Sequence, residues 1–209
     1  MLAIIDYGAG NLRNVTMAFR RLGVQATMTA DPADITRASA LVLPGVGSFG
    51  DAMANLRARK LEAPITAAIR AGLPFLGICV GMQVLFEVGE EMGEHRGLGI
   101  VPGRVRRFGS GVTVPHMGWN QIHQTKSTPL WDGVPDGSYA YFVHSYYCDA
   151  QDDAVVAART DYDHGFVSAI ASGNVAAIQF HPEKSQDVGE RILRNYLKMA
   201  DRAAMLAAA

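Results

Sequence analysis

The sequence has few cysteines, almost no net charge and no long apolar run, and each absence excludes a class of protein. Its 209 residues include only 2 cysteines, Cys79 and Cys148, which cannot form a disulfide framework, and the Cys and His spacings fit no zinc pattern. The 19 Lys and Arg against 20 Asp and Glu leave a net charge of -1, so no basic excess can hold a phosphate backbone. We therefore expect no nucleic-acid partner and no bound metal.

The apolar segments do not have the form of a membrane span or a signal peptide. Residues 73–86 are the longest apolar region, but a proline, two glycines and a glutamine interrupt them, and they are too short to cross a bilayer. Residues 1–6 lack a basic segment and reach Asp6 after only a few apolar residues. Together with the scarcity of cysteine, these features predict a cytoplasmic protein without a membrane partner.

The length and the order of the apolar segments predict one α/β domain covering residues 1–209. Short β-branched or apolar runs alternate with helical patterns, which is typical of a parallel sheet covered on both faces. In the first half, strands are expected at residues 2–6, 24–29, 40–43 and 74–78, with helices at 12–22, 51–59 and 64–71. A glycine-rich alternation at 99–122 predicts a β-rich insertion, followed by strands at 139–146, 154–159, 166–171 and 175–180 and a helix at 188–206.

The segment Gly77-Ile78-Cys79-Val80-Gly81 follows an apolar strand and precedes a helical stretch. A nucleophile on a sharp strand-to-helix turn has a strained backbone, and small neighbours allow the turn to close. The segment therefore predicts a nucleophile elbow, with the Cys79 thiolate favoured by the helix N-terminus. A small buried apolar residue is the alternative for Cys79, but it does not explain the glycines. Cys148 lacks this context and is interpreted as such a buried residue.

A thiol nucleophile requires a base, and His181 is the strongest candidate because Glu183 follows it by two residues. Residues two apart on an extended chain point to the same side, so the carboxylate can hold the imidazole in the tautomer that faces Cys79. The other histidines are interpreted as surface residues at His95, His123 and His164 and are left unassigned at His116 and His144.

Two N–H donors are needed for the oxyanion of a tetrahedral intermediate. The main-chain N–H of Val80 is one candidate, and the N–H of Val46, in the turn Pro44-Gly45-Val46-Gly47, is the other. Because glycines flank Val46, its peptide can point into the oxyanion hole or away from it. A phosphate-binding loop is the rival interpretation of this turn, but no Lys-Ser or Lys-Thr pair follows it.

These motifs resemble those of the class I, or triad, glutamine amidotransferases, which release ammonia from glutamine with a Cys-His-Glu triad. The resemblance rests on the elbow, on Gln179-Phe180-His181-Pro182-Glu183 and on the turn at residues 44–47, and it covers essentially the whole chain. Further segments are similar to the glutaminase subunits of imidazole glycerol phosphate synthase: residues 6–12 (DYGAGNL), 44–50 (PGVGSFG), 115–120 (PHMGWN), 142–147 (FVHSYY) and 184–185 (KS).

The resemblance implies a flavodoxin-like α/β fold: a mixed, mainly parallel sheet with helices on both faces and a β-rich insertion. It implies an enzyme of histidine biosynthesis that hydrolyses L-glutamine to glutamate and ammonia through a thioester on Cys79, without a cofactor. It also implies a heterodimer with a cyclase subunit, a TIM barrel, which receives the ammonia through a channel.

The resemblance further implies substrate and partner contacts. Glutamine would contact Gly47, Gln83, Glu87 and the main chain at Ser145 and Tyr146. Gln83 and Glu87 would lie one turn apart on the elbow helix, and a solvated helix acid is the alternative for Glu87. The cyclase would contact Asn11, Met117, Trp119 and Lys184, with Lys184 forming a salt bridge. A core aromatic is the alternative for Trp119.

Three other functions share parts of this pattern. Another glutaminase of the class, feeding GMP or cobalamin-type synthesis, has a very similar elbow. A free-standing γ-glutamyl hydrolase has the same chemistry and needs no partner. A binding or scaffolding protein can keep such a fold without the activity, but the presence of Cys79, His181 and Glu183 argues against this last alternative.

Overall fold

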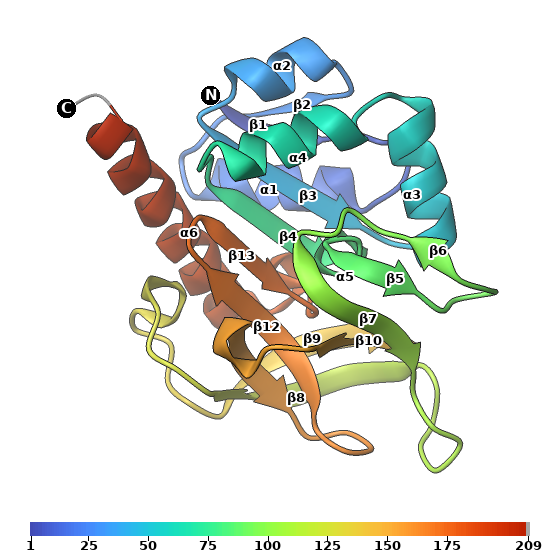
Figure 1. Cartoon of the computed structure of the whole chain (residues 1–209). Helices are drawn as coiled ribbons and strands as arrows, with labels where there is room; N and C mark the ends of the chain where they lie inside the picture. The colour runs from blue at the N-terminus through green and yellow to red at the C-terminus, as the bar shows by residue number, and fades with distance from the viewer. Residues whose placement is uncertain (208–209) are drawn as a thin grey trace.

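The protein is described here by a computed structural model covering residues 1–207, in which a large sheet has a parallel half and an antiparallel half (Figure 1). In the parallel half the order is β2-β1-β3-β4-β13. These strands are β1 (Leu2–Ile5), β2 (Ala26–Thr29), β3 (Ala40–Gly45), β4 (Phe75–Cys79) and β13 (Val175–Ile178). Every residue of β1, β3, β4 and β13 is buried, as continuous apolar runs require in a sheet covered on both faces.

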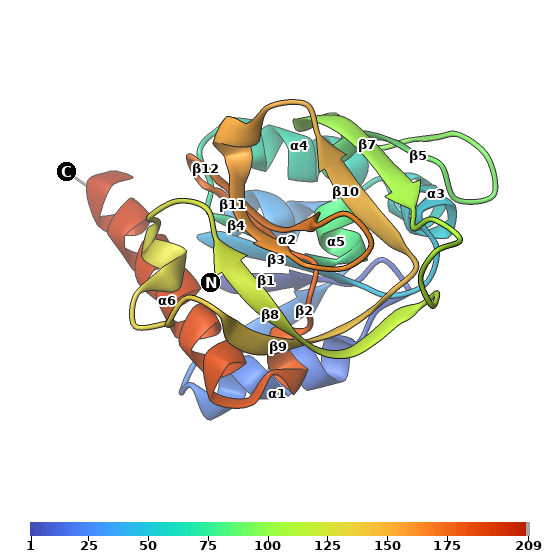
Figure 2. The same cartoon turned by 90° about the horizontal axis from the view of Figure 1, so that it is seen from below.

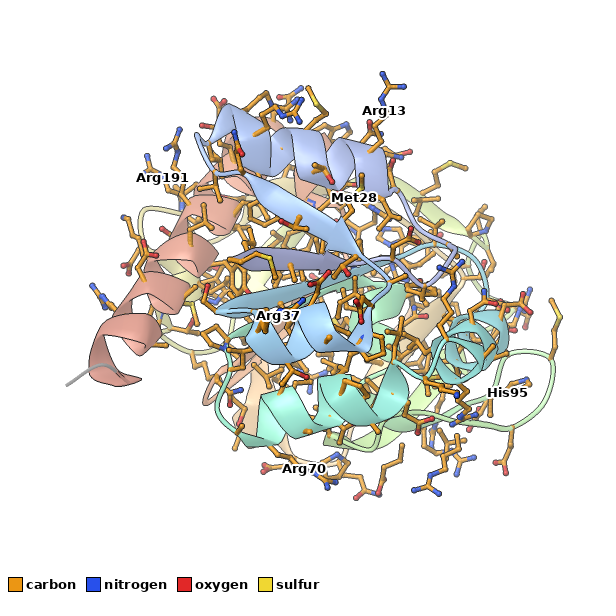
Figure 3. All side chains as sticks on the ribbon, turned by 90° about the horizontal axis from the view of Figure 1, so that it is seen from above. Arg13, Met28, Arg37, Arg70, His95 and Arg191 are labelled. Carbon is orange, nitrogen blue, oxygen red and sulfur yellow. The ribbon has the colours of Figure 1, made fainter. Side chains whose placement is uncertain are left out.

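Helices cover both faces of the parallel half. They are α1 (Leu12–Arg21), α2 (Pro32–Arg37), α3 (Phe49–Ala58), α4 (Glu62–Arg70) and α6 (Gln186–Ala207). Figure 2 shows α1 and α6 on one side of the sheet and α4 on the other. In Figure 3, Arg13 of α1 and Arg70 of α4 extend from these opposite faces. This arrangement confirms the fold class predicted from the alternating pattern.

Local sequence determines where several of these helices begin and end. Asp31 accepts a hydrogen bond from the Ala33 N–H at the start of α2, and Ser48 accepts one from the Asp51 N–H at the start of α3. Gly23 has a φ of 81°, the left-handed conformation that ends α1. The predicted helices at 12–22, 51–59, 64–71 and 188–206 are confirmed as α1, α3, α4 and α6, whereas the six-residue α2 was not predicted.

The antiparallel half contains the predicted β-rich insertion. Its strands are β5 (Phe86–Gly89), β6 (His95–Arg96), β7 (Val101–Arg107), β8 (His116–Gln124), β9 (Ser138–His144), β10 (Tyr146–Ala150), β11 (Val156–Thr160) and β12 (Phe166–Ser172). Two short 3-10 helices, η1 (Pro129–Trp131) and η2 (Asp153–Val155), connect strands of this half, and a third, η3 (Pro182–Lys184), connects β13 to α6. Within the half, β5 pairs in parallel with β7, and β8 and β9 form an antiparallel ribbon.

The strand order brings together the carboxyl ends of β3, β4 and β13, where the predicted chemistry lies. Gly45, the last residue of β3, is in register with Cys79, the last residue of β4. Ile178, which ends β13, is in register with Ile78. Open α/β sheets bind ligands at this edge. Because β13 lies next to β4, His181 comes close to Cys79 although it is 102 residues later in the sequence. Among the described helices, none has both the length and the apolar composition of a membrane span.

Candidate active site

Cys79 lies at a strand-to-helix elbow, as predicted. It ends β4 and precedes the short helix α5 (Val80–Gln83), with φ 56° and ψ -112°, a conformation that non-glycine residues rarely adopt. The neighbouring glycines are required by space. A Cβ on Gly81 would lie 1.7 Å from the carbonyl oxygen of Leu43, and one on Gly77 would lie 2.6 Å from the carbonyl oxygen of Gly81. The elbow therefore closes only because these two positions lack side chains.

His181 and Glu183 form a buried hydrogen-bonded pair beyond the end of β13. The Nδ1–H of His181 donates to Oε1 of Glu183 at 3.0 Å, and their side chains are 3% and 1% exposed. Asn11 Nδ2 donates to the same oxygen at 3.0 Å. Since the carboxylate accepts the hydrogen bond from Nδ1–H, Nε2 is the imidazole nitrogen left for the thiol. The predicted contact is present, but the extended backbone expected for it was wrong, because Pro182–Lys184 form the 3-10 helix η3.

The electrostatics of the triad favour a charged imidazole. Burial by itself lowers the pKa of His181, but the nearby Cys79 sulfur and the Glu183 carboxylate outweigh burial and raise it from 6.5 to about 10. Burial opposes the charged form of Glu183 too, and this effect by itself raises the pKa of the carboxyl group. The hydrogen bond from His181 outweighs burial, so the pKa of Glu183 is lowered. These pKa shifts favour an ionised Glu183 and a protonated His181 near neutral pH.

The triad opens into a cavity of about 340 Å³ at the carboxyl edge of the sheet. Its lining consists of Val46, Gly47, Cys79, Val80, Gln83, Glu91, Pro115, Val143, His144, Ser145, Tyr146 and His181. The sequence-predicted nucleophile, base, oxyanion donors and four of the five predicted glutamine contacts are thus around one space.

Glu87, the fifth predicted glutamine contact, does not line this cavity. The expectation that it follows Gln83 by one helical turn was wrong, because α5 ends at Gln83 and residue 87 lies in β5. There the exposed Glu87 accepts a hydrogen bond from the Gly103 N–H through Oε2. Side chains repeat about every 3.6 residues on a helix but alternate between two faces on a strand. Because residue 87 lies on a strand, Glu87 does not share a face with Gln83.

Glu91 is an acidic residue of the cavity lining that the sequence did not predict. It follows β5, and its Oε2 accepts a hydrogen bond from the Phe49 N–H at 2.8 Å, which holds the carboxylate beside the start of α3. The pair Glu90-Glu91 was visible in the sequence, but nothing local distinguishes it from an ordinary polar loop. Its position depends on β5 pairing with β7 across the sheet.

Amide side chains connect the elbow to the opposite wall of the cavity. Gln83 Nε2 donates to the Tyr146 carbonyl and to Gln179 Oε1, both at 3.1 Å. Gln179 Nε2 in turn lies 3.5 Å from the Cys79 sulfur. Both protons of the Gln83 amide are therefore used within the protein, which leaves its carbonyl oxygen as the atom available to a ligand.

Comparison with known proteins agrees with this geometry. The family model for "Glutamine amidotransferase class-I" matches residues 3–200. The chain belongs to the class I glutamine amidotransferases. The curated protein "Imidazole glycerol phosphate synthase subunit HisH" of Desulfitobacterium hafniense (strain Y51) is 48% identical over 204 residues, covering 98% of this chain and 97% of the relative. The protein with the same description from Syntrophotalea carbinolica is 51% identical, covering 94% of this chain and 98% of the relative.

Solved structures show the same fold at lower identity. A structure described as "Crystal structure of glutamine amidotransferase" has a TM-score of 0.76 and 21% identity, covering 95% of this chain and 98% of that chain. The structure "PurLQS from Thermotoga maritima" contains a chain with a TM-score of 0.74 and 22% identity, covering 94% of this chain and 97% of that chain. These likenesses confirm the class I amidotransferase fold.

Of the four residues predicted to contact the cyclase, three lie on one exposed face of the protein. Met117 and Trp119 are 62% and 47% exposed on β8, and Lys184 is exposed on η3. Tyr141 of β9 lies between the last two: its ring is edge-on to Trp119 at 6.1 Å, and the Lys184 Nζ is 5.3 Å from its centroid. We call Met117, Trp119, Tyr139, Tyr141 and Lys184 the aromatic face. Asn11 differs, because its amide is bound to Glu183.

A larger depression of about 610 Å³ lies at the opposite edge of the sheet, between α2, α4 and α6. Its lining is rich in alanine and contains no carboxylate, imidazole or thiol. The smaller cavity, which Cys79 and His181 line, is therefore the candidate active site. Within residues 1–207, no three His, Cys, Asp or Glu side chains are grouped as a metal ion requires.

Proposed function

We propose that this chain is the glutaminase subunit of an imidazole glycerol phosphate synthase, and that Cys79, His181 and Glu183 are its catalytic triad. The observation that carries the proposal is a strained elbow that places Cys79 in one cavity with an imidazole whose Nδ1 is bound to a buried carboxylate. The similarity to proteins described as subunits of this synthase, which extends over nearly the whole chain, supports its assignment to this synthase.

In the first half of the reaction, the Cys79 thiolate attacks the side-chain amide carbon of glutamine. The carbonyl electrons move to oxygen, and the oxyanion is stabilised by the N–H groups of Val80 and Val46 at the ends of β4 and β3. His181 then transfers the proton on Nε2 to the amide nitrogen, the C–N bond breaks, and ammonia leaves a thioester on Cys79.

In the second half, a water molecule gives its proton to His181 and attacks the thioester carbon. Collapse of the second tetrahedral intermediate expels the Cys79 thiolate and releases glutamate, which restores the starting protonation state. Glu183 keeps the imidazole in one orientation through both halves and stabilises its charge. Each proton therefore passes through the same nitrogen, Nε2 of His181.

Glutamine is recognised at its α-ammonium and α-carboxylate by groups on the cavity wall. We assign the ammonium to Glu91, the carboxylate among the residues that line the cavity. The main chain at Gly47, Ser145 and Tyr146 and the carbonyl oxygen of Gln83 remain the other candidate contacts. A charge-assisted contact with Glu91 discriminates against substrates that lack a free α-amino group.

The aromatic face is the proposed docking surface for the cyclase subunit. Exposed aromatic and Met side chains beside a lysine are typical of the centre and rim of a protein interface. A free-standing γ-glutamyl hydrolase has no need of such a face, so this observation favours an ammonia-transferring subunit in a heterodimer over the hydrolase.

The decisive experiment is Cys79→Ala, assayed in complex with the cyclase. Glutamine-dependent synthesis should fall below roughly 1% of the wild-type rate, because loss of a nucleophile costs several orders of magnitude. Ammonia-dependent synthesis should persist, since the cyclase only requires ammonia. Cys148→Ala is the matched control and should retain both activities: Cys148 is buried in β10, and burial raises its thiol pKa. Glutamine turnover by Cys79→Ala at more than a few per cent would contradict the assignment.

A further inference from the structure

Two buried histidines take no part in the mechanism above and face each other on the inner side of the β8–β9 ribbon. His116 and His144 occupy opposed positions in the register, and they are 5% and 6% exposed. His116 Nδ1 lies 3.0 Å from His144 Nε2. Aromatic side chains surround the pair: Phe108, Phe142, Tyr162 and Phe166.

The hydrogen bonds around this pair allow only one arrangement of protons. His144 Nδ1 lies 2.8 Å from the Tyr146 carbonyl oxygen, which can only accept, so Nδ1 carries the proton. Burial lowers the pKa of His144 to about 3 and that of His116 to about 4, so both rings are neutral. His144 Nε2 must then accept from His116 Nδ1–H.

The same reasoning extends to the outer end of the chain of bonds. With its proton on Nδ1, His116 has Nε2 left as an acceptor, and Asn120 Nδ2 lies 3.2 Å from it. Asn120 Nδ2 also donates to the Asp161 carbonyl at 3.0 Å, and its Oδ1 accepts from the Gln121 N–H. Both the tautomer and the orientation of each ring are therefore determined by groups that cannot change their role.

The inner end of this chain of bonds is the wall of the catalytic cavity. The Tyr146 carbonyl that accepts from His144 also accepts from Gln83 Nε2, and Gln83 is linked through Gln179 to the Cys79 sulfur. The two histidines thus hold a peptide that is shared between the wall and the elbow. Because a peptide is planar, a fixed carbonyl direction fixes the plane of the Tyr146–Tyr147 peptide. That plane includes the Cα of Tyr146, a residue that lines the cavity.

We propose that His116 and His144 are positioning residues for glutamine: they fix the Tyr146 peptide and, through it, the wall against which the substrate binds. The inference deepens the proposed function and rests on its use of the Ser145–Tyr146 main chain. Neither histidine touches the reacting atoms, so their contribution is to the KM for glutamine more than to kcat.

The test uses two replacements of His144 that each keep one of its nitrogens. In His144→Asn, the amide nitrogen takes the place of Nδ1 and can still donate to Tyr146. In His144→Gln, the amide oxygen takes the place of Nε2 and can still accept from His116, but the donor to Tyr146 is lost. Assayed in the cyclase complex, His144→Gln should raise the glutamine KM about 10-fold, the effect of one lost hydrogen bond, and His144→Asn should restore most of it.

A merely structural role predicts a different result, because both variants remove the same ring from the same aromatic cluster. Equal KM values for His144→Asn and His144→Gln would overturn the inference. His123→Gln, on the same ribbon but half-exposed, is the control and should leave KM unchanged. Absence of any glutaminase activity in the wild-type complex would instead contradict the proposed function itself.

The protonation states of the two histidines can also be measured in the wild-type protein, so this second test does not require a variant to fold. Long-range ¹H–¹⁵N NMR spectra of the wild-type complex, recorded between about pH 6 and 8, should show both rings neutral with the proton on Nδ1. A charged ring, or an Nε2–H tautomer at either residue, would overturn the proposed order of bonds.

Discussion

At the scale of single residues, Glu183 receives both of its hydrogen bonds on one oxygen. His181 Nδ1 and Asn11 Nδ2 each donate to Oε1 at 3.0 Å, whereas Oε2 has no hydrogen-bond partner among the described residues. A glutamine at this position can therefore keep both bonds through its own Oε1. What it loses is the negative charge that stabilises the imidazolium.

Glu183→Gln should consequently be less damaging than His181→Ala or Cys79→Ala. We expect its loss of glutaminase kcat to be roughly 10- to 100-fold smaller than that of the other two, because the base and the nucleophile take part in every bond change. Steady-state glutaminase assays of the three variants in the cyclase complex measure the ranking. Equal losses would mean that the carboxylate does more than orient and stabilise His181.

The raised pKa of His181 also predicts how stability depends on pH. Burial opposes the charge, and Cys79 and Glu183 overcome it, so the pKa in the folded protein is about 10 against an ordinary 6.5. The charged ring stabilises the fold fully below about pH 6.5, and this contribution disappears as the pH rises towards 10. Replacing His181 with glutamine removes this charge, and it also removes packing contacts. The stability lost with those packing contacts is the same at every pH.

The difference in unfolding free energy between wild type and His181→Gln should therefore be largest near pH 6 and shrink by pH 9. Urea unfolding at several pH values measures it. A difference that is constant, or that grows with pH, would show that His181 is not charged in the folded protein.

At the scale of elements, the elbow depends on backbone contact between α5 and β3. The Cβ of an alanine at position 81 would lie 1.7 Å from the Leu43 carbonyl oxygen, and a main-chain atom in a central strand cannot move aside. The elbow must open if a side chain is added. Loss of activity and loss of stability should therefore occur together at this position.

Gly81→Ala should destabilise the protein by about 3 kcal/mol or more, in the upper range for overpacked cores. Thermal or urea unfolding measures the change. Gly111→Ala is the matched control, because a Cβ at Gly111 would meet nothing within 4 Å. If Gly81→Ala unfolds like the control and keeps its activity, the elbow is not sterically closed.

The element scale also explains the exchange of Glu87 for Glu91. A helix continuing from α5 would have put residue 87 on the face of Gln83, which is the arrangement that the family resemblance implied and the spacing allowed. The chain instead enters a strand at Phe86, whose pairing with β7 carries the following residues around to the cavity. One turn of helix instead of two therefore decides which acid lines the cavity.

At the scale of the whole molecule, the aromatic face and the catalytic cavity share the β8–β9 ribbon. Met117 of the aromatic face is opposed to Val143, and both Val143 and His144 line the cavity. Alternate residues of one ribbon point to opposite faces. Trp119 and Tyr141 are opposed on the outer face, and His116 and His144 are opposed on the inner face. A partner that binds outside therefore acts on the same strands that wall the substrate site.

We predict that the isolated chain is a poor glutaminase until the cyclase and its nucleotide ligand bind. If the Val46 N–H points away from the oxyanion hole in the free chain, the loss from that donor alone is roughly 10²- to 10³-fold. Turnover measured for the chain alone, with cyclase, and with cyclase plus nucleotide should rise in that order.

Trp119→Ala should require more cyclase to reach the same activation, since a partner shifts an equilibrium only through its own binding. Similar glutamine turnover for the chain alone, with cyclase, and with cyclase plus nucleotide would contradict the predicted low activity of the isolated chain. It would leave the triad assignment intact. A substitution at Gly45 would be a poorer test of whether the Val46 peptide changes its direction, because it would have a second effect. A Cβ there would lie 2.7 Å from both the Tyr7 hydroxyl and the Val80 Cβ, so the substitution would disturb the elbow as well.

The sequence by itself determined the features that depend on neighbouring residues. The elbow requires Gly77 and Gly81 around Cys79, and the base requires Glu183 two residues after His181, so both are visible in short segments. The apolar alternation likewise predicted the parallel half and the β-rich insertion, because the hydrophobic pattern of a strand or helix reports its own burial.

Only the tertiary structure decided contacts between distant segments. Asn11 meets Glu183 across 172 residues, and His116 meets His144 across 28. An apolar strand has the same pattern whichever neighbour it pairs with, so the pattern predicts a strand but not the side chains it brings together. The pairing of β8 with β9 and of β5 with β7 therefore decided which histidines meet and which acid lines the cavity, because the register between strands positions these side chains.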